Sequence, residues 1–353
     1  MTAHANDTTG EASARPAFDV FNGDADGICA LHQLRLARPA QTTLITGVKR
    51  DVGLLSRIPS PGADAPIDVT VLDISLDTNH ADLVRLLDAG ARVAYYDHHS
   101  ARKAFPHPRL RLAWDDSPAI CTSLIVDREL GGRYRGWAIA AAFGDNLDDC
   151  ASRLSNESGF GERETAALQS LGRILNYNAY GETVADLHVP PAELYRELQP
   201  YRDPFDFLSD SQRYRGLADA YRSDTARLES IKPHCAFDGL AVYVLPDAPW
   251  SRRVSGVLAN RLASAEPGSS FAVLTERADG RYAVSVRSGD PTRRPANELC
   301  EQFASGGGRR GSAGINQLPA GSLGTFIDAF RAYFDHTPVP GIKSADHEPE
   351  QQN

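Results

Sequence analysis

The chain has 353 residues, of which 42% are hydrophobic and 24% are charged, and its formal net charge is −9. This length predicts two domains, and the lack of any apolar run of about 18 residues excludes a membrane-spanning helix. The acidic balance argues against a long nucleic-acid footprint, because such a footprint needs a basic face.

The first half of the chain alternates between strand and helix patterns. Residues 1–15 are small and polar, which predicts a disordered tail. Strands are predicted at 17–21, 43–47, 68–72 and 92–96, and helices at 27–37, 79–88 and 118–130. This alternation is typical of a parallel sheet with right-handed crossovers, so we predict an α/β fold.

The second half is mainly helical up to residue 230, and strands then return. Residues 211–231 resemble an amphipathic connector that Lys232-Pro233 would end. Strands are predicted at 240–245, 269–276 and 282–287, the last two as a hairpin, and helices at 252–263, 296–304 and 323–334. We therefore predict a larger domain at 16–210, a helical connector at 211–235, a smaller α/β domain at 236–335 and a disordered tail at 336–353.

Acidic residues and histidines follow the apolar runs of the first half. Because ligands collect at the carboxyl ends of parallel strands, these side chains are expected to converge there. Carboxylates with imidazole are typical of a divalent metal site. The residues are Asp24 and Asp26 after 18–21, Asp73 after 69–72, Asp97-His98-His99 after 93–96, and Asp145 after 138–144, which is interpreted as a further strand.

Each of these residues also has an ordinary structural interpretation when it is taken alone. An aspartate after a strand can cap a helix or form a turn, and His98 could be a hydrogen-bonded core histidine. Their occurrence after four apolar runs favours one shared site over independent coincidences. Imidazole favours Mn²⁺ over Mg²⁺, and two divalent ions together can polarise a phosphoryl group.

Basic and glycine-rich segments offer candidate phosphate contacts. Gly306-Gly307-Gly308 is followed by Arg309-Arg310, which together could hold a phosphate or form a flexible loop with solvated arginines. Arg287 ends a predicted strand and is a candidate phosphate ligand or a surface arginine. Lys49-Arg50-Asp51 could contact substrate phosphate or cap a helix.

Compartment is predicted from the N-terminus and the cysteines. The N-terminus lacks the charged-then-apolar pattern of a signal peptide, so a cytoplasmic protein is expected. The cysteines are scattered without a Cys-x-x-Cys pair, which predicts reduced, structural residues. They are Cys29, Cys121, Cys150, Cys235 and Cys300.

Taken in order, these motifs resemble those of the DHH phosphoesterase superfamily, over residues 18–335. The superfamily includes RecJ exonucleases, nanoRNases, cyclic-dinucleotide phosphodiesterases and some inorganic pyrophosphatases. The matching motifs are Asn22 to Gly27, Asp73, Asp97-His98-His99 and Gly144-Asp145, and the segment 306–314 resembles the signature of the DHH-associated C-terminal domain.

The resemblance implies a role for each matching residue. Asp24, Asp73, His98 and Asp145 would ligate one metal, with Asp73 bridging to a second, and Asp97 and His99 would support His98 and the nearby phosphate or nucleophile. Ser117 to Leu124 would lie near the active site. Arg287, Gly306, Gly307, Gly308 and Arg309 would grip the substrate in the cleft between the two domains.

Two positions depart from the superfamily pattern. Asn22 stands where an aspartate or histidine is common, and a neutral amide is a poorer metal ligand than a carboxylate, so Asp26 would compensate. Arg309 stands where histidine commonly follows the glycines. Arginine can bind phosphate, but it cannot act as a neutral hydrogen-bond partner.

The expected function is hydrolysis of a short nucleotide by a metal-activated water. The substrate would be a short oligoribonucleotide, a linear dinucleotide or a nucleoside bisphosphate, and the cofactor two Mn²⁺ ions, with Mg²⁺ as the alternative. A homodimer is expected, without membrane association. The alternatives are a RecJ-type single-strand exonuclease, which needs a basic channel and aromatic platforms, and a catalytically weak nucleotide-binding protein, which Asn22 and Arg309 would favour.

Overall fold

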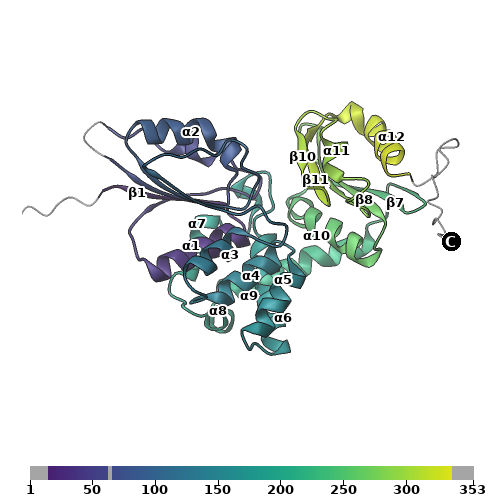
Figure 1. Ribbon diagram of the computed structural model, residues 1–353. Coiled ribbons are helices and arrows are strands. Elements are labelled where there is room, and N and C mark those ends of the chain that lie inside the picture. Colours follow the sequence, from purple (N-terminus) through teal and green to yellow (C-terminus); the bar gives the residue numbers. More distant parts are fainter. Residues whose placement is uncertain (1–14, 63–65, 336–353) are drawn as a thin grey trace, which may run out of the picture. The chain divides into compact units, whose positions relative to one another are not determined.

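The computed structural model describes residues 15–62 and 66–335. The chain forms two compact units (Figure 1). Unit 1 runs to Glu229 and includes Ala248–Val254, and unit 2 contains Ser230–Asp247 and the residues from Ser255 onward. Among the described helices, none combines the length and apolar character needed to cross a membrane.

Unit 1 is built on a parallel sheet of five strands in the order β2-β1-β3-β4-β5. The strands are β1 Ala17–Phe21, β2 Thr43–Ile45, β3 Asp68–Leu72, β4 Arg92–Asp97 and β5 Leu110–Trp114. The four strands predicted from sequence are confirmed. The strand β5 was not predicted, because it is a half-exposed edge strand whose Arg111 interrupts the apolar pattern.

Alternate residues of each strand face two separate cores. Val71 and Tyr95 pack with α2 on one face, whereas Leu72 and Tyr96 pack with α1, α3 and α4 on the other, as the period of two requires (Figure 1). The helices that follow the strands are α1 Ala25–Ala37, α2 Leu76–Asp88 and α3 Thr122–Glu129. The sheet is therefore covered on both sides, as in other parallel α/β folds.

The remainder of unit 1 is helical. Its helices are α4 Arg135–Gly144, α5 Asp148–Glu157, α6 Glu162–Tyr177, α7 Pro191–Leu198, α8 Pro204–Asp210, α9 Gln212–Ala226 and the first turns of α10 Pro249–Ala265. The predicted connector at 211–231 is α9 followed by a 3₁₀ turn at Arg227–Ser230. It lies in unit 1 up to Glu229 and ends its α-helix before Lys232-Pro233.

The run 138–144 is a helix, so its interpretation as a strand is wrong. It forms the end of α4, and its alanines are strong helix formers whose burial on all sides hides any amphipathic period. Gly144 and Gly172 allow α4 and α6 to cross closely, since a Cβ at Gly172 would lie 1.8 Å from the Ala140 carbonyl oxygen. A Cβ at Gly144 would lie 2.5 Å from the Ala25 Cβ, so the end of α4 also meets the start of α1.

Unit 2 contains a mixed sheet in the order β10-β11-β9-β8-β7-β6, in which only β7 and β8 pair in parallel. Its elements are β6 Cys235–Phe237, β7 Leu240–Leu245, β8 Ser270–Glu276, β9 Tyr282–Arg287, α11 Ala296–Cys300, β10 Gly306–Gly308, β11 Ser312–Leu318 and α12 Leu323–Phe334, with the rest of α10. The predicted β8–β9 hairpin is confirmed. The fold class, a parallel α/β domain followed by a smaller α/β domain, is also confirmed.

Candidate metal centre

The strand order places the candidate residues at one edge of the parallel sheet. From β1 the chain crosses to β2 on one side and then to β3 on the other, so the order reverses between β1 and β3. Such a reversal opens a crevice at the carboxyl ends of the two strands. Asp24 and Asp26 follow β1 directly, and Asp73 follows β3, so all three lie at this point of reversal.

His98 is oriented by a backbone carbonyl. Its Nδ1 donates to the Ile120 oxygen at 3.0 Å, which turns Nε2 toward three carboxylates. The Nε2 lies 3.3 Å from Asp73 Oδ1, 3.8 Å from Asp145 Oδ2 and 3.9 Å from Asp26 Oδ2. A second bond of this kind is what usually sets the tautomer and orientation of a metal-binding histidine.

Asp26 is held by the start of α3. Its two carboxylate oxygens accept hydrogen bonds from the backbone amides of Ser123 and Thr122, both at 2.7 Å. The segment 117–124 therefore does lie beside the centre. Burial raises the pKa of Asp26, and the nearby Asp145 carboxylate adds to this effect, although His98 opposes it.

Asp73 has an unusual backbone conformation. Its φ is +59°, a left-handed value that aspartate tolerates better than most residues. Its amide donates to the Tyr96 carbonyl at 3.0 Å, and Thr122 Oγ1 donates to its Oδ1 at 3.3 Å. Burial, together with the charges of Asp26 and Asp24, raises the pKa of Asp73 well above its usual range. A buried carboxylate in this setting favours a cation beside it.

Asp145 reaches the centre from the end of a helix. It is the C-cap of α4, where its amide donates to the Ala141 carbonyl at 2.9 Å. The tight contacts of Gly144 with α1 and α6 bring this helix end next to the first turn of α1. The residue was predicted correctly as a neighbour of the other carboxylates, but for a wrong structural reason.

Asp97 lies beneath the turn that carries the two histidines. Its Oδ1 accepts from the amides of His98 and His99 at 2.9 and 3.2 Å and from His99 Nδ1 at 2.7 Å, and its Oδ2 accepts from the Leu76 amide at 3.3 Å. Asp97 is therefore a positioning residue. Burial lowers the pKa of His99, but Asp97 and Asp73 outweigh this effect, so its net shift is upward.

The residues present fit a divalent ion. Ligand atoms of Asp26, His98 and Asp145 lie within 4.8 Å of one another, as do those of Asp73, His98 and His99. Oxygen donors with imidazole suit Mn²⁺ and, with fewer nitrogen ligands, Mg²⁺. Of the four ligands that the resemblance implied for one ion, Asp73, His98 and Asp145 are brought together, and the fourth place is taken by Asp26 rather than Asp24.

Asp24 is paired with a lysine that the sequence analysis did not place here. Its Oδ1 caps α1 by accepting from the amides of Asp26 and Gly27 at 3.0 and 3.1 Å. Its Oδ2 forms an ion pair with Lys49 Nζ. Lys49 is therefore neither a helix cap nor a residue that contacts only substrate. It follows β2, so the rule that located the aspartates at strand ends could have located Lys49 as well.

Asn22 binds the backbone of Lys49. Its Nδ2 donates to the Lys49 carbonyl at 3.2 Å, and its Oδ1 is buried without a hydrogen-bond partner among the described residues. Gly23 makes this approach possible, since a Cβ there would lie 2.0 Å from the Gly47 oxygen. The turn after β1 and the loop after β2 are thus in direct contact.

The predicted substrate residues lie in unit 2. Arg287 ends β9, where its Nε donates to Asn260 Oδ1 at 2.8 Å. Gly306–Gly308 forms the edge strand β10, so the expectation of a loop is wrong there. A Cβ at Gly306 would lie 1.8 Å from the Cys300 oxygen, which gives this glycine a packing role. Arg309 begins the tight turn to β11. Their contact with substrate stays a prediction.

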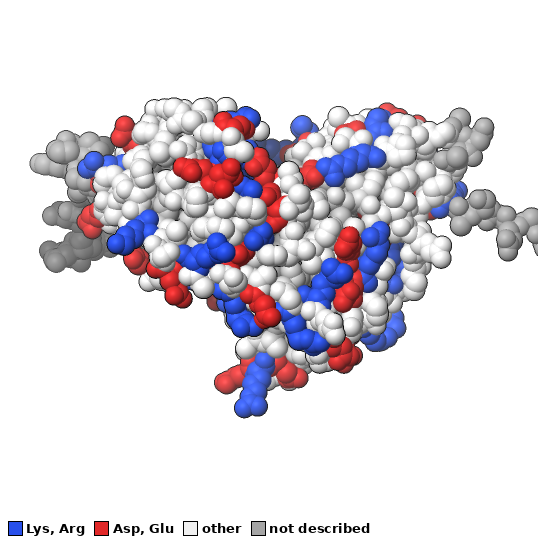
Figure 2. All heavy atoms as spheres, turned by 180° about the vertical axis from the view of Figure 1, so that it is seen from behind, with Lys and Arg blue, Asp and Glu red and all other residues white. Residues whose placement is uncertain are grey.

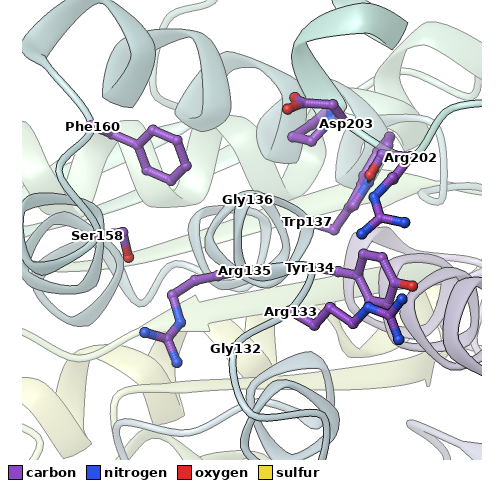
Figure 3. Close-up of a pocket in the computed structure, with 11 residues that line it drawn as sticks. Gly132, Arg133, Tyr134, Arg135, Gly136, Trp137, Ser158, Phe160, Arg202 and Asp203 are labelled. Carbon is purple, nitrogen blue, oxygen red and sulfur yellow. Dashed lines mark hydrogen bonds between the residues drawn. The ribbon is translucent and has the colours of Figure 1, made fainter.

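A separate pocket of about 430 Å³ lies at the other end of α4 (Figure 3). Two of its arginines, Arg133 and Arg202, lie over the ring of Tyr134 at 5.4 and 5.3 Å from its centroid. Because the ten residues of α4 span about 15 Å, this pocket is distinct from the carboxylates around Asp145.

Comparison with known proteins identifies the fold. No protein-family model matches the sequence, and no curated protein shows significant sequence similarity. The chain is structurally similar to a DHH-domain protein that is described as a member of a family of ribosomal proteins, with a TM-score of 0.59, 14% identity, and coverage of 90% of this chain and 86% of the other.

Two further structures are nucleotide-processing enzymes. RecJ from Thermus thermophilus in complex with Mn²⁺ has a TM-score of 0.56 and 16% identity, and the match covers 92% of this chain but only 53% of that RecJ. A pGpG-specific phosphodiesterase, PggH from Vibrio cholerae, has a TM-score of 0.51, 11% identity, and coverage of 91% and 99%. The resemblance to the DHH superfamily is thus confirmed at the level of the fold.

Proposed function

We propose that this protein is a divalent-metal-dependent phosphoesterase that hydrolyses a short nucleotide. The observation that carries the proposal is the orientation of His98, whose Nδ1 binds the Ile120 carbonyl while Nε2 faces the carboxylates of Asp26, Asp73 and Asp145. A core histidine needs no such group of buried carboxylates. The fold shared with RecJ bound to Mn²⁺ supports this interpretation.

The residues of the centre divide the work of hydrolysis. Asp26, Asp73, Asp145 and His98 would hold the ion, which supplies Lewis acidity toward a phosphoryl oxygen and lowers the pKa of water when bound. His99 is about one-third exposed and binds Asp97 through Nδ1, so its Nε2 would contact the phosphoryl group or the leaving oxygen. Asp97 fixes the orientation of that ring.

A nucleotide substrate is supported by Trp114. This residue ends β5 in register with Asp97, is 39% exposed, and donates from Nε1 to the His99 carbonyl at 2.6 Å. An exposed indole held beside the centre offers a face on which a base could stack, worth about 1–3 kcal/mol. Figure 2 shows acidic and basic side chains interspersed over one face of the molecule, in keeping with a short substrate.

The proposal is tested by assaying the purified protein with Mn²⁺ against a linear dinucleotide, a five-residue RNA, a long single-stranded DNA, a cyclic dinucleotide and a nucleoside bisphosphate. Release of mononucleotide or phosphate from a small substrate, abolished by chelator, is expected. Cleavage of the long strand alone would favour an exonuclease, and nucleotide binding without turnover would favour a binding protein.

The Trp114 contribution can be separated from the chemistry. Trp114→Ala should raise KM for a dinucleotide by about tenfold, because a stacking contact is lost while the metal ligands remain. Val184→Ala is the matched control, since Val184 is a comparably exposed apolar side chain at 40%. An unchanged KM in Trp114→Ala would remove the indole from the substrate site.

A further inference from the structure

The ammonium group of Lys49 has a complete set of oxygen partners inside the acidic centre. Its Nζ forms an ion pair with Asp24 Oδ2, donates to Asn176 Oδ1 at 3.2 Å, and lies 3.5 Å from Asp145 Oδ1. An ammonium has three N–H donors, so these three acceptors match its capacity. The nitrogen also lies 5.9 Å from the centroid of the Tyr180 ring, which favours a cation on that side.

Both backbone polar groups of Lys49 are fixed as well. Its amide donates to the Ala179 carbonyl at 2.9 Å, and its carbonyl accepts from Asn22 Nδ2 at 3.2 Å. An aspartate at position 22 could not make the second bond, because a carboxylate has no N–H to donate. Asn22 and Lys49 therefore act as one unit, in which the amide side chain positions the lysine.

The place of this ammonium excludes a divalent ion on the same oxygen. Manganese ligands of this kind lie about 2 Å from the ion, and an ammonium already bound to Asp24 Oδ2 would then lie against a second cation. Burial alone would lower the pKa of Lys49, but the carboxylates of Asp24 and Asp145 outweigh it and keep the group charged. Asp24 is 2% exposed, so it has little solvent with which to replace the lysine.

We propose that Lys49 supplies one of the two positive charges of this centre, so that the chain binds a single divalent ion, between Asp26, Asp73, His98 and Asp145. The inference rests on the proposed metal-dependent function, and it replaces the two-metal expectation. Lys49 is then a fixed cation beside a removable one. A phosphoryl group bound at the centre would contact a charge that chelators do not extract.

The number of bound ions tests the inference. The purified full chain is saturated with Mn²⁺, freed of excess metal, and analysed for manganese per chain by elemental analysis, with electron paramagnetic resonance to distinguish an isolated ion from a coupled pair. One isolated Mn²⁺ per chain supports the inference. A coupled pair overturns it and leaves the proposed function standing, whereas no bound manganese overturns both.

A double variant tests the role of the unit. Asn22→Asp combined with Lys49→Ala restores a carboxylate and removes the ammonium, so manganese binding should rise from one to two ions per chain with a coupled spectrum. Lys232→Ala, which changes an exposed lysine, should remain at one ion. A folded double variant that still binds one isolated ion would overturn the assignment of Lys49, and the wild-type measurement stands if that variant does not fold.

Discussion

Asp24 and Asp26 lie two residues apart in one turn, and yet they serve the two sides of the acidic centre differently. Asp26 is held by two amides of α3 and faces His98. Asp24 caps α1 and binds Lys49. The same side chain thus becomes a candidate metal ligand or a partner for a fixed ammonium according to what lies opposite. The comparison shows that the motif alone does not assign a ligand.

The largest expected effect breaks the metal-binding side. His98→Ala removes the one imidazole that faces Asp26, Asp73 and Asp145, so affinity for Mn²⁺ should fall by more than about 100-fold, and hydrolysis should fall with it. Calorimetric titration with Mn²⁺ measures this directly. His234→Ala, at an exposed histidine in unit 2, should bind as the wild type does. Metal binding that survives in His98→Ala would place the site elsewhere.

The comparison itself is tested by two matched variants, Asp26→Asn and Asp24→Asn. Asp26→Asn should weaken Mn²⁺ binding by about 10–100-fold, since it removes a ligand charge and turns an N–H toward an amide donor. Asp24→Asn should weaken it less, because an asparagine still caps α1 and the charge lost is that of the lysine's partner. Equal losses in the two variants would show that both sides ligate metal.

A smaller effect is expected from Asp97→Asn. The asparagine oxygen can still accept from the His99 ring, but its Nδ2 would face the Leu76 amide, so one buried hydrogen bond is lost. We expect about a tenfold loss of Mn²⁺ affinity and a loss of about 1–3 kcal/mol in the free energy of unfolding. Denaturant unfolding and metal titration of the same samples check both. Unchanged metal affinity would mean that the histidine turn keeps its geometry without Asp97.

The smallest effect separates the scaffold from the centre. Burial lowers the pKa of His32 from 6.5 to about 4, and its bond to the Tyr201 carbonyl only partly offsets this. The unfolded chain therefore binds a proton first as pH falls, so this contribution to stability is complete above pH 6.5 and is lost down to about pH 4, by up to about 3 kcal/mol.

His32→Gln should flatten that pH dependence, because glutamine can donate to the same carbonyl without titrating. Thermal unfolding followed by circular dichroism between pH 4 and pH 7 measures the slope. A slope as steep in His32→Gln as in the wild type would assign the acid sensitivity to other groups. Comparisons of the two sides of the centre are cleanest above pH 6.5, where this contribution is constant.

Much of the site could be predicted because strand ends are local features of the sequence. Asp26, Asp73 and His98 follow apolar or β-branched runs, and a parallel sheet brings such positions to one edge. Asp145 follows an apolar run that is a buried helix, and no periodicity distinguishes the two in so short a segment. The sequence motif suggested its place, but its route depends on the close packing of Gly144 and Gly172.

Lys49 could not be assigned from its neighbours in the chain. Its partners Asp24, Asp145 and Asn176 lie far from it in sequence, and only the contact of Gly23 with the Gly47 oxygen brings its loop to the motif. The strand β5 was missed for a related reason, because an edge strand is defined by its one neighbour more than by its own residues. Long-range packing determined both results.

The left-handed Asp73 and the carboxylates packed around it have a consequence for how much protein accumulates. These carboxylates repel one another when no ion lies between them, so metal binding should raise the free energy of unfolding, by about 2.7 kcal/mol at a metal concentration 100 times Kd. A difference of that size changes the fraction of chains open to proteases. Cells short of metal should therefore contain fewer copies of the protein, and not only less active ones.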